Sequence, residues 1–104
     1  MNYKVFDFNN VIHEKNRLLI LTLLLKCEKM SFSELKENLN LTDGNLVSHL
    51  KVLEDNKIIE IEKRFVGRKP KTFYKLTKDG KEKFLNYLND LKNFLIFVGG
   101  IYDR

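Results

Sequence analysis

The stretch 42–76 constrains the fold most, because a helical pattern runs directly into an alternating segment, a turn and a returning segment. Its first part has leucines three or four residues apart, a spacing that places one apolar stripe on a helix. They are Leu46, Leu50 and Leu53. Residues 59–65 then alternate in polarity as a strand does, the glycine- and proline-containing segment 67–70 follows, and residues 71–76 form the returning strand. We therefore expect a helix followed by an antiparallel hairpin.

The other faces of this helix carry polar or very small residues. They are Asp43, Gly44, Asn45, Ser48, His49 and Lys51. Such residues let a helix approach base edges in the major groove, where Asn45 can pair with adenine. The hairpin has five basic residues and no acid from Lys63 to Lys71, which favours contacts with phosphates. A solvated helix face and a solubilising hairpin turn are the alternative interpretations, but the two features together favour duplex DNA.

The preceding helices follow from apolar runs and capping residues. Asn9 or Asn10 caps a first helix that runs to about Lys26, and its run 18–25 is apolar nearly all round. We expect this helix at the centre of the core. Residues 30–32 form an extended link.

A second helix runs through Asn40 and starts at Ser33, or at Ser31 with Glu34 as a capping box. Thr42 caps the third helix.

Thr77 caps a last helix that runs through about Val98, where Gly99-Gly100 ends it. Some of its apolar residues repeat at steps of four and three, as in a coiled-coil seam. They are Phe84, Leu88, Leu91, Leu95 and Val98. A second stripe, Leu85 with Phe94, is expected to pack on its own domain. Residues 77–98 therefore predict a dimerisation helix, with an intramolecular role for both stripes as the alternative. The N-terminal Tyr3, Val5, Phe6 and Phe8 can join the same interface.

Composition narrows the function classes. The 104 residues, 43% hydrophobic, suffice for a single domain over 1–104, and the net charge of +5 favours a polyanionic partner. Cys27 is the only cysteine, which excludes an internal disulfide and a cysteine-rich zinc site and fits a reducing cytoplasm. We interpret Cys27 as a core or boundary residue. The run 18–25 is too short to span a bilayer.

No glycine-rich phosphate loop, metal cluster or nucleophile–base pair is readable in the sequence, so we expect no cofactor, no metal and no enzymatic activity. His13 and Arg17 are one helical turn apart and suit packing or capping. For His49, a DNA contact and an idle surface position are equally open.

Five motifs carry a resemblance that covers nearly the whole chain. They are Ile12–Leu18, Phe32–Lys36, Leu41–Glu54, Arg64–Pro70 and Leu76–Gly80. In them the sequence resembles the winged-helix transcriptional regulators of the MarR/ArsR superfamily, of the small archaeal and bacterial type. The resemblance implies an α+β fold, a winged helix-turn-helix with a two-stranded wing and a long C-terminal dimerisation helix. It also implies dimers that bind pseudo-palindromic operators. The cysteine pairs of metal-sensing ArsR members are absent, which argues against metal sensing.

The expected function is sequence-specific double-stranded DNA binding as a homodimeric transcriptional regulator. The expected DNA-binding residues are Ser33, Thr42, Asp43, Gly44, Asn45, Ser48, His49, Lys51, Arg64, Arg68, Lys69 and Lys71. The alternative is a protein–protein interaction module in a larger assembly, which would carry acidic or apolar groups on the wing and third helix. A small effector molecule could bind between the first and last helices, but no residue pattern identifies its chemical class.

Overall fold

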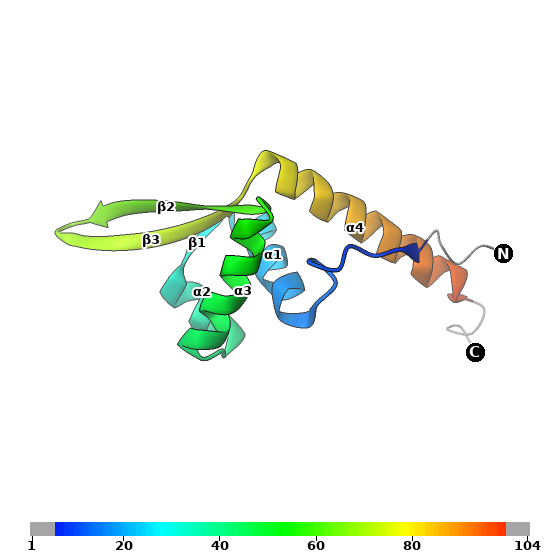
Figure 1. Ribbon diagram of the computed structural model, residues 1–104, viewed down its shortest axis with the longest axis horizontal. Helices are drawn as coiled ribbons and strands as arrows, with labels where there is room; N and C mark the ends of the chain where they lie inside the picture. The colour runs from blue at the N-terminus through cyan, green and yellow to red at the C-terminus, as the bar shows by residue number, and fades with distance from the viewer. Residues whose placement is uncertain (1–5, 100–104) are drawn as a thin grey trace.

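The computed structural model describes residues 6–99 (Figure 1). Within them the chain forms four helices and a three-stranded antiparallel sheet of strand order β1-β3-β2. The helices are α1 (Lys15–Cys27), α2 (Phe32–Leu39), α3 (Asp43–Asp55) and α4 (Lys78–Phe97). The strands are β1 (Lys29–Ser31), β2 (Ile59–Val66) and β3 (Lys69–Leu76). The α2–turn–α3 unit followed by a hairpin confirms the predicted winged helix-turn-helix.

Strand β1 is an element that the sequence pattern did not predict. Where an extended link was expected at 30–32, residues 29–31 pair antiparallel with residues 73–75 of β3. The sheet is therefore three-stranded only near its base, and further out β2 and β3 pair with each other alone. Figure 1 shows this two-stranded arm projecting away from the helices.

The arm closes in a two-residue turn, Gly67-Arg68, because Val66 pairs directly with Lys69. Gly67 has a φ of 66°, in the left-handed region that glycine adopts at little cost. Lys69 and Pro70, which the sequence pattern placed in the turn, already belong to β3.

The caps of three helices lie where the sequence predicts them. Ser31 and Glu34 form the reciprocal capping box of α2, with N···O distances of 3.2 and 3.0 Å, so the Ser33 alternative is wrong. The hydroxyl oxygens of Thr42 and Thr77 accept hydrogen bonds from backbone N–H groups in the first turns of α3 and α4, at 3.2 and 2.8 Å.

The start of α1 differs from the prediction. Its N-cap is Glu14, whose Oε2 accepts a hydrogen bond of 2.8 Å from the backbone N–H of Arg17. The Asn9 side chain instead accepts from the backbone N–H groups of residues 11 and 12 and closes an earlier turn. This turn inserts Ile12 fully into the core, so the chain cannot continue as one helix from Asn10.

The core lies between α1, α3 and the first half of α4. Its fully buried side chains include Ile12, Ile20, Leu21, Leu24, Leu35, Leu46, Leu53, Ile58, Ile59 and Phe84. Helix α1 is central, as expected, but only one of its faces is buried, since Leu19 remains 43% exposed.

Helix α4 presents different residues to the domain than the sequence predicts. Phe84 and Tyr87 are buried in the domain's own core, and Leu88 and Leu91 pack partly against it. Leu85, expected to pack inward, is 46% exposed. The seam predicted for a partner is therefore largely an intramolecular contact at its first three positions.

The second half of α4 extends beyond the winged-helix body, opposite to the arm (Figure 1). There Phe94 packs against the rings of Phe6 and Phe8, with centroids 5.5 and 5.8 Å away. Tyr3, Val5 and Gly100 lie outside the described residues.

Candidate nucleic-acid interface

Helix α3 offers its small polar face to solvent. Its leucines point into the core, and this fixes the helix so that Gly44, Ser48 and Lys51 lie exposed on the opposite face. No heavy atom lies within 4 Å of where a Cβ on Gly44 would stand, so nothing in the protein itself requires glycine there. Asn45 is exposed on the flank beside this face, and its side chain makes no hydrogen bond within residues 6–99.

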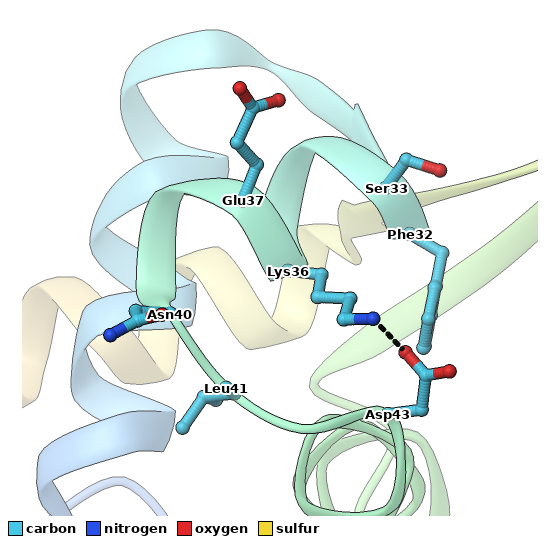
Figure 2. Close-up of a pocket in the computed structure, with 7 residues that line it drawn as sticks. All are labelled: Phe32, Ser33, Lys36, Glu37, Asn40, Leu41 and Asp43. Carbon is cyan, nitrogen blue, oxygen red and sulfur yellow. Dashed lines mark ion pairs between the residues drawn. The ribbon is translucent and has the colours of Figure 1, made fainter.

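Two charged side chains of α3 already have partners. Lys36 of α2 reaches across the helix-turn-helix to Asp43, with a distance of 2.8 Å between Nζ and Oδ1 (Figure 2). Lys51 pairs with Asp55 one turn further along α3, at 3.3 Å. Both pairs are exposed, so each contributes little to stability, and Lys51 can exchange its partner for a phosphate at small cost.

The Lys36–Asp43 pair spans an open hollow of about 650 Å³ between α2 and the start of α3 (Figure 2). Its lining residues are Phe32, Ser33, Lys36, Glu37, Asn40, Leu41 and Asp43. Ser33, a predicted contact residue, is thus exposed at the rim of this hollow, beside the end of α3 that the prediction places against DNA.

His49 is placed differently from the expectation of a free position on the recognition face. Its Nδ1 lies 3.2 Å from Nη1 of Arg17 and 3.6 Å from Oε2 of Glu14, and its Nε2 lies 3.4 Å from Nδ2 of Asn16. Both ring nitrogens therefore face the start of α1. The histidine connects two helices and is turned away from the exposed face of α3.

Glu14 is the carboxylate of this cluster. Burial by itself raises its pKa, but hydrogen bonds from the backbone N–H groups of Arg17 and Asn16, with the nearby charges of His49 and Arg17, lower it below the ordinary value of 4.5. Arg17 also donates from Nε to the backbone oxygen of Val11 at 2.6 Å. These contacts confirm the packing role expected for Arg17.

His13 also packs within the domain, as expected. Its Nδ1 lies 2.7 Å from the hydroxyl oxygen of Tyr87, and its ring stacks on Phe8 at 5.0 Å between centroids. Together with the His49 contacts, these interactions make the segment 9–17 a link between α3 and α4.

The arm has two chemically different faces, because residues alternate along each strand and opposite residues share a face. One face carries Arg64 and its partner Lys71, whose cationic groups lie 4.6 and 5.9 Å from the ring centroid of Phe73. Phe73 is buried although it lies outside the main core, which is consistent with cover by these long side chains. Neither cation forms an ion pair among the described residues.

The other face of the arm turns toward α3. Here a hollow of about 220 Å³ lies between the arm and α3. It is lined by Val47, Leu50, Lys51, Glu54, Ile61 and Tyr74. At the tip of the arm, Arg68 of the turn and Lys69 at the start of β3 are exposed and form no ion pair within residues 6–99. The flank of α3 and the base of the arm are therefore continuous.

Three residues of this region were missed by the sequence interpretation. Lys36 pairs with the start of α3, Val47 is 52% exposed on α3, and Phe65 is 72% exposed on the arm. The signal for Val47 was available, because it falls outside the leucine spacing of its helix. The role of Lys36 depends on how α2 and α3 cross, which no local pattern reveals.

Other candidate chemistry is sparse. Cys27 is exposed at the end of α1, so a place in the core is wrong. Among residues 6–99 no three His, Cys, Asp or Glu side chains gather as metal ligands would. None of the helices in that range has the length and apolar character needed to cross a bilayer.

Comparison with known proteins agrees with this geometry. Residues 16–95 match the family model described as winged helix DNA-binding domain. Uncharacterized protein MJ0432 of Methanocaldococcus jannaschii is 43% identical over 84 residues, which cover 81% of this chain and 87% of that protein.

Solved structures share the fold. A transcriptional regulator homologue from Pyrococcus horikoshii OT3 superposes with a TM-score of 0.82 at 32% identity, over 91% of this chain and 93% of that one. A MarR-family protein of Enterococcus faecalis V583 has the same fold, with a TM-score of 0.74 at 22% identity over 90% and 84% of the two chains. The resemblance predicted from the motifs is thus confirmed. The chain belongs to the family of winged helix DNA-binding domains.

Proposed function

We propose that this protein is a homodimeric transcriptional regulator that binds specific double-stranded DNA and acts by occupying promoter sites. The observation that carries the proposal is the continuity of two surfaces. Lys51 belongs to the small polar face of α3 and also lines the hollow between α3 and the arm, and the tip of the arm bears Arg68 and Lys69, which have no acidic partner in the described chain. A helix for base edges beside cations for the backbone is the division of labour that duplex recognition needs.

In this proposal, Gly44, Asn45 and Ser48 lie at base edges, and Arg64, Arg68, Lys69 and Lys71 lie at phosphates. Ser33, Thr42 and Asp43 surround the start of α3, Lys51 lies further along it beside the arm, and all four contact the flanking backbone or bases. His49 is left out of this set because its ring nitrogens face α1.

The proposed dimer contact is the second half of α4. Leu95 and Ile96 are 49% and 66% exposed, and Leu85 lies exposed further back on the same helix. Full burial of one such side chain in the interface contributes about 1.5–3 kcal/mol to the stability of the dimer. In a two-fold dimer each residue contributes twice, once from each protomer. Phe6 and Phe8 pack on the same half of α4 and extend this surface. Phe84 takes no part, since it is fully buried in its own domain.

Sedimentation velocity at micromolar concentration tests the dimer. The wild type should sediment as a dimer, and Leu95→Lys with Ile96→Lys should sediment as a folded monomer. Asn38→Lys with Asn86→Lys adds the same charge at exposed polar positions away from Leu95 and Ile96 and is the matched control. A wild-type monomer, or equal dissociation of both double variants, would contradict the proposed interface.

Selection of bound duplexes from a randomised pool tests the DNA proposal. We expect a pseudo-palindromic sequence with half-sites about 34–36 Å apart, one helical turn, because a two-fold dimer repeats its recognition helix. A pool that stays unenriched would contradict sequence-specific binding.

A protein–protein module within a larger assembly is the second candidate, and one observation favours it. The arm exposes Phe65 and Val66, and apolar side chains there are what such a module would show. This candidate predicts negligible affinity for any duplex at moderate salt, which the same selection would reveal.

A further inference from the structure

Phe65 is the most exposed large apolar side chain in the described part of the chain, at 72%. It lies on β2 two residues before the turn and directly opposite Pro70 of β3. Because opposite residues share a face, the two apolar groups form one small ridge near the end of the arm. This ridge lies on the same face as Ile61, four residues earlier on the strand.

Packing within the domain does not account for the exposed ring. Strand β1 pairs only with residues 73–75, so no third strand reaches this part of the arm. Phe65 is also absent from the core and from the residues packed against it. A cross-strand pair with Pro70 stabilises the hairpin only slightly, and a β-branched residue would stabilise it as well.

The charge around Phe65 indicates the kind of partner. Five cations and no acid lie between Lys63 and Lys71, so both faces of the arm are positive here, with Lys63 on the face of Phe65 and Arg64, Lys69 and Lys71 on the other. A protein surface that accepts a phenylalanine is on average neutral or mixed in charge, whereas the grooves of duplex DNA are bordered by phosphates on both sides.

Distance indicates which groove Phe65 would reach. Ile61 shares a hollow with Val47 of α3, and four residues of strand carry the chain about 13 Å further, to Phe65. One helical turn of DNA is about 34–36 Å, so the centres of adjacent major and minor grooves lie roughly 17 Å apart. With α3 in the major groove, Phe65 reaches across one backbone to the adjacent minor groove.

We propose that Phe65 enters the minor groove as an apolar wedge that partly unstacks one base step and bends the duplex. The inference rests on the DNA binding proposed above. Arg68 and Lys69 lie beside the wedge and contact the phosphates that border the opened minor groove. Pyrimidine–purine steps such as TA and CA unstack most easily, so Phe65 adds a sequence preference at a position that α3 does not touch.

Energy transfer between dyes at the two ends of a selected duplex measures the bend. Binding of the wild type should shorten the end-to-end distance of the duplex. With Phe65→Ala bound, the distance should return most of the way to that of the free duplex. Phe65→Leu keeps an apolar wedge and should retain the bend. Val66→Ala is the matched control, since Val66 is the exposed neighbour on the other face of the arm.

Replacing the pyrimidine–purine step of the duplex by a stiff AA step should lower the affinity of the wild type about fivefold or more, which is the low end of the cost of one changed base pair. The affinity of Phe65→Ala should not change. Phe65 is exposed, so thermal unfolding should confirm that Phe65→Ala folds normally. A wild type that binds its selected duplex without bending it, or a bend that survives in Phe65→Ala, would overturn the wedge and leave the proposed function intact. Absence of any preferred duplex would instead overturn the proposed function and the wedge with it.

Discussion

His49 of α3 and Arg17 of α1 lie side by side, with 3.2 Å between Nδ1 of the histidine and Nη1 of the arginine. Glu14 approaches the same histidine nitrogen to 3.6 Å and caps α1 through the backbone N–H of Arg17. A small polar cluster therefore connects α3 to α1. Glu14 is the carboxylate in this cluster.

Neutralising Glu14 should lower stability in a pH-dependent way. The pKa of Glu14 is lowered in the folded protein, so its ionised form stabilises the fold above the ordinary value of 4.5, and this contribution is lost as the pH falls through the folded pKa. Glu14→Gln keeps an oxygen acceptor for the cap but removes the charge. Urea unfolding should give a smaller free energy of unfolding for the variant at about pH 7, with the difference closing below about pH 4.5. Glu37→Gln, at an exposed position without an ion pair in residues 6–99, is the control. A difference that persists unchanged at acid pH would show that the charge of Glu14 has no such role.

Gly44→Ala should separate folding from DNA binding. The position is exposed and open, so alanine should maintain the fold or stabilise it by up to about 1 kcal/mol through helix propensity. At the proposed base-facing surface, the added methyl group should hold the helix away from the groove. We expect at least about a fivefold loss of affinity for the selected duplex, with an unchanged or higher melting temperature. Undiminished affinity would mean that Gly44 does not lie at the base edges.

Gly80→Ala, the same chemical change in α4, should have the opposite effect on folding. A Cβ at Gly80 would overlap the backbone carbonyl of Ile58, which cannot move without disturbing the base of the sheet. Overpacking of this kind costs about 1–3 kcal/mol or more, which denaturant unfolding measures directly. A variant as stable as the wild type would show that α4 can shift away from Ile58 at no cost.

The sequence predicts the elements whose signals are local. The Ser31–Glu34 capping box and the threonine caps at 42 and 77 depend on side chains within a few residues of their helix starts. The leucine stripe of α3 and the alternation of the hairpin are local as well. These signals suffice for the fold class.

What was not predicted depends on contacts between distant residues. Strand β1 exists because three residues pair with β3, more than forty positions away. Helix α1 starts late because Ile12 inserts into the core. The rotation of α4 is set by Gly80 packing on Ile58, which turns Phe84 inward and leaves Leu85 outside. Helical periodicity gives the stripes of a helix but not which stripe faces its own domain.

The candidate site divides in the same way. The polar residues of α3 and the cations of the arm follow from composition and spacing. The engagement of His49 by Arg17 and the cover of Phe73 by Arg64 and Lys71 do not, because each joins separate elements.

Titration of a selected duplex and a shuffled duplex at several salt concentrations tests the central claim, that α3 reads bases while the arm binds phosphates. Asn45→Ala and Ser48→Ala should each reduce the difference in binding free energy between the two duplexes by about 1–3 kcal/mol, which is the contribution of one base-specific interaction. Arg68→Ala with Lys69→Ala should lower the affinity for both duplexes by a similar factor. The slope of log affinity against log salt should become less steep by about one unit for each phosphate that these cations bind. Equal binding of both duplexes by the wild type, or an unchanged salt slope in the Arg68 and Lys69 double variant, would contradict this account.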